Sequence, residues 1–467
     1  MAQDIKVENG PEPQYYDQED VKSSPPSAQM DPFGAEDSAD VKYKTLTWWQ
    51  TGIIMIAETV SLGVLSLPAA VASIGMAPAV VLIVGLGFIS TYSGYLIGQF
   101  RQKYPFIHSM ADAGEILMGQ VGRNVLELGQ LLFFLFATGS HLLTFTVMMN
   151  TLTEHGTCSI VFGVVGLILS FLLSLPRTMK NVSWLAMASF ISIFVAVMVT
   201  MIGVGVERPG KGIYSVTQKT DFVSGFTAVT NIVFAYCMFF LLHYSRQYAN
   251  DSGGHPGYFG FIAEMKNPED FPKSLCLQQG FEILLYTISA AVVYRYAGDG
   301  VASPALGSTG PLLRKVAYGL AIPTIVIAGV VLGHVAIKTI YVRIFRGTNV
   351  MHQRSFLGTG AWIGLTLAFW TISWVIAEAI PVFSDLLSLI SALFVSWFSY
   401  GLPGVFWLYM YWGDYFSSPK KILLCLTNVG LVAIGTTICA CGLWVSGLAI
   451  HEDSKGAAGS FSCANNA

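Results

Sequence analysis

The sequence predicts an all-α membrane protein that crosses the bilayer eleven times, and three observations support this fold class. Hydrophobic residues make up 53% of the 467 residues and charged residues only 11%, whereas roughly a quarter of an ordinary soluble domain is charged. Nearly uncharged stretches of the ~20 residues that span a bilayer recur from Trp49 almost to Ile450. None of them alternates like a barrel strand, so each is expected to satisfy its backbone hydrogen bonds as a helix. This composition excludes a soluble enzyme.

The expected spans follow one another between charged turns and turns bounded by proline or glycine. They cover residues 50–75, 77–100, 125–149, 159–175, 182–206, 222–242, 274–297, 315–338, 359–380, 383–411 and 422–449. Ahead of them, residues 1–45 hold ten acidic residues and four lysines among prolines and serines, which is typical of a disordered tail and not of a cleavable signal peptide. We therefore expect an acidic cytoplasmic tail (1–45), a membrane domain (46–450) and an extracellular carboxyl tail (451–467).

Basic residues predict this orientation. The loops on the amino-terminal side of the expected spans carry thirteen Lys and Arg residues, whereas the opposing loops and the carboxyl tail carry seven. Cytoplasmic loops are enriched in these residues, so the amino terminus is expected in the cytoplasm and, after an odd number of spans, the carboxyl terminus outside. The net charge of −3 and the scattered basic residues do not indicate a nucleic-acid partner.

Two of the seven cysteines form a candidate disulfide pair. Cys158 and Cys463 both fall on the expected outer side, where they either pair or remain as thiols. The other five lie in or beside apolar stretches, where a thiol behaves as a small hydrophobic group. No CxxC motif indicates a redox or zinc site.

Two expected helices are interrupted near mid-membrane. Residues 58–68 (ETVSLGVLSLP) place a glycine, hydroxyl groups and a proline halfway through the first span, where helical hydrogen bonds must fail. The sixth span contains residues 231–237 (NIVFAYC) and, further on, 254–261 (GHPGYFGF). Broken helices five spans apart are typical of transporters with two inverted halves, whose half-helix ends bind a carboxylate and a cation or ammonium group at midplane. A pair of proline kinks tolerated by neighbouring helices is the alternative.

Three segments resemble the amino acid/auxin permease family of transmembrane amino acid transporters, and in particular its fungal permeases for neutral amino acids. They are residues 59–68 (TVSLGVLSLP), 174–177 (SLPR) and 264–273 (EMKNPEDFPK), and the resemblance covers the membrane region from about 45 to 450. It implies eleven helices in a five-plus-five inverted repeat with helices 1 and 6 broken. It also implies secondary active uptake of amino acids, usually driven by protons, and it does not fix the substrate side chain.

Residues 238–253 depart from this family pattern, in which the sixth helix passes directly from FAYC to GH. The sixteen extra residues include a polar run, 245–252, at a depth where lipid or packed protein should lie. Back-translation from Cys237 gives GTATGTT, similar to a fungal 5′ splice site, and later codons can supply the branch point GCTAAC and a terminal CAG. Removal of these 48 bases keeps the frame and restores Cys before Gly254. We interpret the segment as a translated, unspliced intron, with a genuine lineage-specific loop as the alternative.

Substrate binding is assigned to residues of the two interruptions. They are Ser61, Gly63, Val64 and Ser66 in the first span and Phe234, Ala235 and Tyr236 in the sixth. Small residues and broken backbone in these positions let a substrate approach main-chain polar groups. Aromatic residues in membrane helices also serve simply as packing or interfacial anchors, which is the alternative role of Phe234 and Tyr236.

Proton coupling is assigned to Glu58, Glu282 and His255. A carboxylate within an apolar span is costly unless it is paired, protonated or hydrated, so it is a functional candidate by default. Low dielectric raises the pKa of a carboxyl group, as a reversible proton carrier requires, and Glu58 lies about one and a half helical turns before Gly63. Alternatively, Glu58 caps freed amides of the broken helix. His255 follows the sixth-span interruption and either couples protons, because histidine titrates near neutral pH, or is a hydrogen-bonded structural residue.

Other polar residues of the spans are expected to have structural roles. Glu127 is expected at the membrane interface, and Glu378, near the outer end of its span, is expected in water. His141 and His334 lack a metal-ligand partner four residues further on and are expected to be packing residues.

These features predict a plasma-membrane importer of neutral amino acids, aliphatic and aromatic, that works by proton symport and alternating access. Its partners would be the amino acid and the lipid bilayer, and it would need no metal or cofactor beyond the proton gradient. An amino acid sensor with the same fold and an exchanger at an organelle membrane are the alternatives. A membrane-embedded enzyme is disfavoured because the sequence has no HExxH, GxSxG or clustered histidines.

Overall fold

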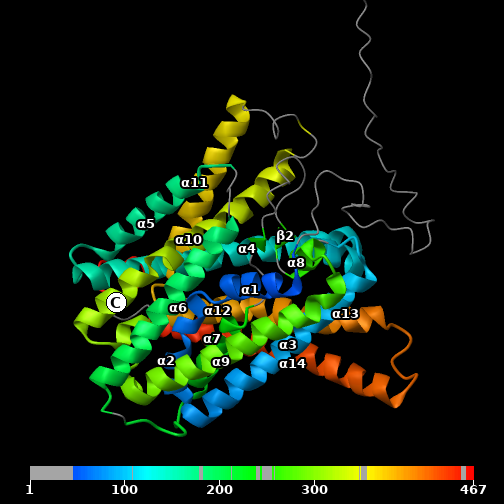
Figure 1. The fold of residues 1–467 in the computed structure, drawn as a ribbon. Helices are drawn as coiled ribbons and strands as arrows, with labels where there is room; N and C mark the ends of the chain where they lie inside the picture. Colours follow the sequence, from blue (N-terminus) through cyan, green and yellow to red (C-terminus); the bar gives the residue numbers. More distant parts are fainter. Residues whose placement is uncertain are drawn as a thin grey trace, which may run out of the picture.

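The computed structural model describes most of the chain as packed helices (Figure 1). The described residues are 46–107, 109–177, 182–211, 213–237, 242–243, 255–256, 258–345, 348, 355–453 and 459–466. Within them the only regular structure besides helices is one antiparallel pair of two-residue strands, β1 (Leu242–His243) and β2 (His255–Pro256). The polar tail expected at residues 1–45 lies outside the described residues, as does most of 238–253.

The first expected span consists of two half-helices joined by a short irregular segment. Helix α1 (Trp48–Thr59) and helix α2 (Leu67–Ile74) flank the short helix η3 (Leu62–Leu65), and the span bends by 50° at this point. Pro68 lies in the first turn of α2, where its missing N–H costs nothing. Helix α3 (Met76–Lys103) follows directly.

Helix α4 (Met110–Thr153) begins 15 residues before residue 125, the expected start of the third span. It consists of two helical segments joined at a kink. Met118 and Gly119 have non-helical backbone angles, and Gly119 adopts φ 64°, a conformation that side chains disfavour. The bend folds the first turns back, so that a Cβ on Gly114 would lie 2.5 Å from the carbonyl oxygen of Gly122. Helices α5 (Ser159–Ser174) and α6 (Val182–Glu207) agree with the expected fourth and fifth spans.

The sixth span ends earlier than expected. Helix α7 (Phe222–Ala235) stops at the interruption and does not reach residue 242, because the chain turns at Tyr236 instead of continuing its hydrogen bonds. Its amino end is capped by Asp221, which accepts a hydrogen bond from the backbone N–H of Ser224 at 3.0 Å; this bond lowers the pKa of Asp221. The chain resumes as the short helix α8 (Tyr258–Glu264).

The remaining chain is also helical. In order it forms η4 (Pro268–Asp270), α9 (Phe271–Ala297), η5 (Gly298–Gly300), η6 (Ala305–Ser308), α10 (Pro311–Phe345), α11 (Phe356–Ala379), α12 (Phe383–Ile390), the π-helix η8 (Ser391–Gly401), α13 (Leu402–Met410) and α14 (Pro419–Asp453). Elements α12, η8 and α13 are continuous and together cover the expected tenth span.

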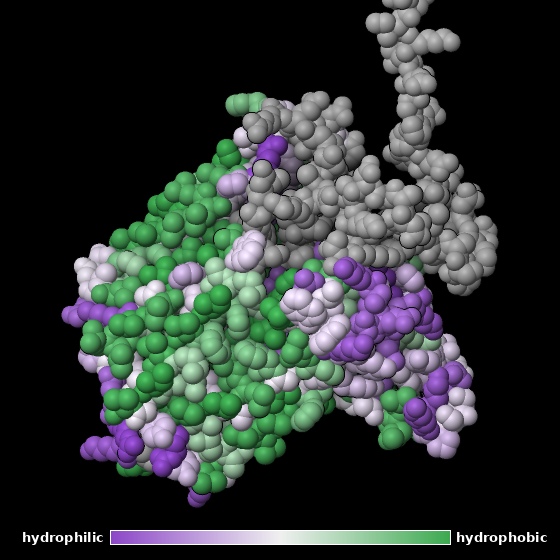
Figure 2. Space-filling view, in the orientation of Figure 1, coloured by the Kyte–Doolittle hydropathy of each residue, from purple (hydrophilic) through white to green (hydrophobic). Residues whose placement is uncertain are grey.

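The helices have the length and composition of membrane spans. Among the described residues, eight helices are long and apolar enough to cross a bilayer, the bent pair α1 and α2 makes a ninth, and α5 and α7 are shorter apolar helices. Figure 2 shows a broad hydrophobic surface over α5, α6 and α9, with hydrophilic residues gathered toward the side of α8 and α13 and again toward the carboxyl-terminal side. Such a belt matches the hydrocarbon core of a membrane.

Helices that are far apart in sequence pack in pairs. Helix α2 packs against α7, α3 against α9, α4 against α10, and α5 against α11. Helices α1, α7 and α12 lie in the middle of the bundle in Figure 1. The interior of the molecule is therefore formed by the broken segments, with longer helices around them.

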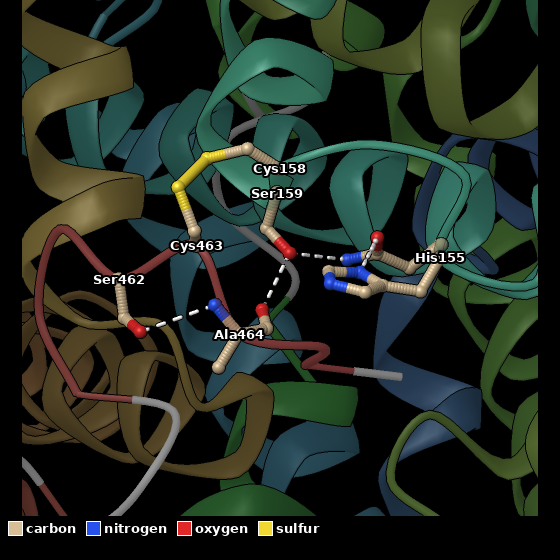
Figure 3. The surroundings of a disulfide bond; sticks show 7 residues. His155, Cys158, Ser159, Ser462, Cys463 and Ala464 are labelled. Atoms are coloured by element: carbon tan, nitrogen blue, oxygen red, sulfur yellow. Dashed lines mark hydrogen bonds between the residues drawn. A yellow bond between two sulfur atoms is a disulfide. The ribbon is translucent and has the colours of Figure 1, made fainter.

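The carboxyl tail is fastened to the ends of α4, α5 and α11 (Figure 3). Cys158 and Cys463 form a disulfide, which confirms the candidate pair. Asn150 donates a side-chain hydrogen bond to Asn466 at 2.7 Å, and the backbone N–H of Phe461 donates to the carbonyl of Glu378 at 3.0 Å. The tail thus joins helix ends that are more than 200 residues apart in sequence.

The side chain of Glu378 corrects one expectation. It is only 7% exposed and accepts a hydrogen bond from Trp374 Nε1 at 3.1 Å, so the prediction of a solvated carboxylate is wrong. The tail and the close approach of Gly163 cover it. Glu127 pairs with Arg343 at 2.8 Å in a partly exposed position, as an interfacial residue would.

Candidate functional site

The first interruption exposes main-chain groups in the middle of the bundle. Helix α1 ends at Thr59, Val60 is extended, and Ser61 has φ −137° and ψ −130° before η3 begins. The backbone groups at the ends of these half-helices lack the partners that a continuous helix would give them. The side chain of Ser66 folds back onto the carbonyl of Gly63 at 2.9 Å and helps to hold this turn.

The second interruption lies directly against the first. A Cβ built on Gly63 would lie 2.8 Å from the Cα of Ala235, closer than real Cβ contacts come. Glycine is therefore required at residue 63 so that the backbone of the first interruption can approach the last turn of α7. The two interruptions that the sequence predicts meet at one place.

Beside this contact lies a cavity of about 520 Å³, a volume that includes the part of the cavity open to solvent. The interruptions form one wall, and helices α4 and α10 form the other. The lining residues are Thr59, Ser61, Leu62, Gly63, Phe234 and Cys237 on the first wall, and Phe133, Ala137, Ser140, His141, Ala328 and Leu332 on the second. No Asp, Glu, Lys or Arg is among them.

Two polar side chains of the lining have unused hydrogen-bonding atoms in the described part of the chain. Ser61 Oγ is buried without a partner. His141 uses Nδ1 for the carbonyl of Ile325 at 3.0 Å. The cavity is thus largely apolar, with main-chain groups of the interruption and a few uncharged polar atoms on its surface, as is usual for small-molecule sites.

A buried polar network joins both broken helices next to the cavity. Glu282 on α9 is completely buried and accepts hydrogen bonds from Gln278 Nε2 at 2.9 Å and Gln279 Nε2 at 3.1 Å. Gln278 also donates to Thr59 Oγ1 at 2.8 Å and accepts from the hydroxyl of Tyr258 at 2.9 Å. Through one glutamine, the carboxyl group of Glu282 is linked to the end of α1 and to the start of α8.

Glu58 lies one residue before the end of α1 and is 8% exposed. One of its carboxyl oxygens, Oε2, is buried and makes no hydrogen bond in the described residues. A buried carboxyl oxygen without a partner is costly when the group is charged, which favours a protonated form or a partner that arrives during function. Two buried acids are thus connected with the first interruption: Glu58 lies next to it in sequence, and Glu282 is linked to it by hydrogen bonds through Gln278.

The structure brings together only some of the residues assigned to substrate binding. Ser61, Gly63 and Phe234 line the cavity, and Ala235 packs against Gly63. The other three lie elsewhere. Val64 lines a second, smaller cavity, the hydroxyl of Ser66 donates a hydrogen bond to the carbonyl of Gly63, and the ring of Tyr236 packs on Tyr286 with centroids 5.3 Å apart. His255 belongs to β2 and pairs with His243 in register; nothing further is described of its side chain.

The wall formed by α4 and α10 was not anticipated. Ala137, Ser140 and His141 lie within residues 137–141 (ATGSH), a small and polar stretch inside an otherwise apolar span. Small residues in a membrane helix mark close helix packing or a cavity, and this signal could have directed attention to α4. His141 is a packing residue as expected, since it is 6% exposed and its Nδ1 lies 3.0 Å from the carbonyl of Ile325, but it also lines the cavity. His334 packs too, with Nε2 2.9 Å from the carbonyl of Pro176.

The described residues contain no group of three or more His, Cys, Asp or Glu side chains that could hold a metal ion.

Comparison with known proteins gives consistent matches over most of the chain. A family model described as transmembrane amino acid transporter protein matches residues 44–448. The N amino acid transport system protein of Neurospora crassa is 37% identical over 415 residues, which cover 87% of this chain and 85% of the relative. A transmembrane transporter of Fusarium pseudograminearum is 27% identical over 379 residues, which cover 79% and 76%.

Two solved structures match most of the chain at low sequence identity. A Na⁺-coupled sialic acid symporter in a substrate-bound outward-open state matches with a TM-score of 0.49 and 12% identity, covering 87% of this chain and 91% of the symporter. MhsT in complex with L-phenylalanine matches with a TM-score of 0.49 and 12% identity, covering 85% and 97%.

Proposed function

The chain belongs to the transmembrane amino acid transporter family, and from this premise we propose that it imports neutral amino acids by proton symport and alternating access. The observation that carries the proposal is the cavity at which both interruptions meet. Among the described residues, its lining contains no Asp, Glu, Lys or Arg side chain, so a charged substrate side chain would be left without a counter-charge in a low-dielectric site.

The charged ends of the amino acid would bind to the interruptions. Helix α1 and helix α7 both end at this point, and the carbonyl groups at the carboxyl end of a helix favour a positive charge. The substrate ammonium would lie there, and its carboxylate would lie near the main-chain N–H groups of residues 61–63. The substrate side chain would then point toward α4 and α10, where Phe133 and Leu332 suit apolar groups.

The packing of the helices supports eleven spans in a five-plus-five arrangement. Counting α1 with α2, α7 with α8, and α12 to α13 as one span each gives eleven. In this count, α3 and α9, α4 and α10, and α5 and α11 are each five spans apart and in contact. Such pairing is what two inverted halves produce, and rocking of one half against the other would open the cavity to each side in turn.

Glu58 and Glu282 are the proposed proton-coupling residues, with His255 as the third. Glu282 is linked through Gln278 to Thr59, which lines the cavity. Gain or loss of a proton on this carboxyl group changes its hydrogen bonds to the two glutamines and therefore acts on the ends of both broken helices. That linkage gives a physical route from protonation to the substrate site.

The proposed orientation has a cytoplasmic amino terminus and an extracellular carboxyl tail in the plasma membrane. The Cys158–Cys463 disulfide supports this side for the tail, since such bonds persist in oxidising surroundings and are rare in the cytosol. The excess of Lys and Arg in the opposite loops supports it independently.

We further propose that residues 238–253 are a translated intron and that the functional protein has 451 residues. In the structure, seven residues separate Thr59 from Leu67 at the first interruption, and 22 separate Ala235 from Tyr258 at the second. Without the sixteen residues, six would remain. The two interruptions would then be nearly equal in length, as two halves of one repeat should be.

Uptake by purified protein in liposomes tests the function. Labelled neutral, acidic and basic amino acids are offered with and without an imposed pH gradient, to both the 467-residue and the 451-residue form. We expect the 451-residue form to accumulate neutral amino acids only when the gradient is present. Accumulation without a pH gradient would contradict proton symport. Exchange without net accumulation would indicate an exchanger, and specific binding without any transport would indicate a sensor.

A further inference from the structure

His141 lines the cavity from α4, and its hydrogen bond to α10 determines which of its two ring nitrogens can act as an acceptor. Its Nδ1 lies 3.0 Å from the carbonyl oxygen of Ile325 on α10. A carbonyl oxygen only accepts, so Nδ1 must carry a hydrogen. In the neutral ring Nε2 is then the unprotonated nitrogen, with a lone pair and no hydrogen to donate.

The ring is held in place by the packing of α4 on α10. Gly329 lies beside it, and a Cβ at that position would come within 2.9 Å of His141 Cβ. The missing side chain lets the ring rest against the backbone of α10, one turn from the carbonyl that it binds. His141 is only 6% exposed, so rotation of the ring would break its hydrogen bond without replacing it.

The α4 and α10 wall offers acceptors and no donors. The hydroxyl of Ser140 donates to the carbonyl of Ala137 at 2.7 Å, so its hydrogen is already in use. Nε2 of His141 makes no hydrogen bond within the described part of the chain. The other four lining residues of this wall, Phe133, Ala137, Ala328 and Leu332, are apolar.

A wall of this kind distinguishes substrates by hydrogen-bond donors. A side-chain O–H or N–H can be accepted by Nε2, whereas a methyl group of the same size leaves the ring nitrogen buried without a partner. An unsatisfied buried acceptor costs roughly five- to a hundredfold in affinity. A side-chain carboxylate would meet only lone pairs and would lose its hydration.

We propose that His141 is a specificity residue that favours, within each pair of similar shape, the neutral amino acid whose side chain carries a hydrogen-bond donor. Threonine would be preferred over valine, and asparagine over leucine. The inference rests on the proposed transport of neutral amino acids and names the substrate class for the same cavity. The preference for a side-chain donor would then come from Nε2 of His141 and not from the size of the cavity.

Competition by the unlabelled members of each pair against labelled uptake tests this inference. All variants are made in the 451-residue form, and this form, here called the wild type, is compared with His141→Leu, which removes the acceptor, and with His141→Gln, whose side-chain oxygen can take the place of Nε2. We expect threonine to compete about tenfold better than valine in the wild type, this ratio to fall to about one or below in His141→Leu, and to be largely restored in His141→Gln. His155→Asn, outside the cavity, serves as the control.

The outcomes separate the two proposals. If the wild type takes up neutral amino acids but does not discriminate threonine from valine or asparagine from leucine, the role of His141 is wrong and the transport function stands. An unchanged ratio in His141→Leu also overturns it. If His141→Leu does not fold, the ratios of the wild type and of His141→Gln decide the question. If no amino acid is taken up at all, the proposed function itself fails.

Discussion

The two interruptions of this protein serve the same cavity but differ in construction. The first is short, lies wholly among the described residues and is closed by the contact of Gly63 with Ala235. The second separates α7 from α8 by 22 residues, sixteen of which have no counterpart in the first. The difference suggests what a binding interruption needs, namely two half-helix ends held close to one point, and it is one ground for the proposal that residues 238–253 are an insert.

The largest expected effect comes from making the two interruptions alike. Deletion of residues 238–253 should convert an inactive or unstable chain into a transporter, because it joins Cys237 directly to Gly254 and shortens the second interruption to nearly the length of the first. Uptake by the two forms at equal amounts in the membrane measures this. Sequencing of the mature transcript is the independent check. Transcripts that uniformly retain the 48 bases, together with full transport by the 467-residue protein, would rule out the intron.

Crowding the contact between the interruptions should have the next largest effect. Gly63→Val should abolish substrate binding, because a Cβ at this position meets Ala235 at 2.8 Å and must push the two backbones apart. Equilibrium binding of a labelled amino acid to purified protein is the measurement. Gly85→Val is the matched control, since nothing lies within 4 Å of a Cβ there. Normal affinity in Gly63→Val would place the substrate site elsewhere.

Neutralising the buried acids should remove proton coupling and leave substrate binding intact. Glu58→Gln and Glu282→Gln keep hydrogen-bonding groups but cannot titrate, so each should lose proton-driven accumulation while exchange of internal for external amino acid continues. Glu115→Gln, which affects only a surface pair with Arg123, should leave both unchanged. If one of the two buried variants still responds to pH as the wild type does, that residue has no role in proton coupling.

A smaller effect is expected far from both interruptions. Cys463→Ser should lower the stability of the protein by about 2–4 kcal/mol, because the tail would no longer be covalently joined to the start of α5, and the substrate affinity should stay within a factor of about two. Thermal unfolding in detergent measures the stability, and equilibrium binding measures the substrate affinity. Cys276→Ser, at an exposed thiol, is the control, and equal stability of the two variants would mean that the tail does not act as a clamp.

Much of the fold could be predicted because membrane helices are specified locally. The apolar stretches identified most helix positions to within a few residues, and the helix-breaking residues of 58–68 located the first interruption. The early end of α7 and the long bent start of α4 were not anticipated. The end of α7 depends on a contact between distant residues, Ala235 with Gly63, and the bent start of α4 depends on a close backbone approach of Gly114 to Gly122 across the bend; the pattern of apolar residues reveals neither.

The site was only half predictable for a related reason. Interruptions carry a sequence signal, so Ser61, Gly63 and Phe234 were assigned from it and do line the cavity. The uninterrupted helix α4 carries only the weaker signal of the small and polar stretch 137–141, and the role proposed for His141 depends on which of its ring nitrogens binds the carbonyl of Ile325. Val64 and Ser66 belong to the same interruption but face elsewhere, because only part of a turn can face one cavity.

The most direct test that both interruptions form one amino acid site uses Cys237, which lines the cavity. In a variant that lacks the other cysteines outside the disulfide, a small thiol reagent should modify Cys237 and block uptake. A neutral amino acid at ten times its half-saturating concentration should slow this modification about tenfold by occupying the cavity, whereas glutamate should not. Modification at the same rate with and without the transported amino acid, in a protein that transports it, would contradict the placement of the substrate between the two interruptions.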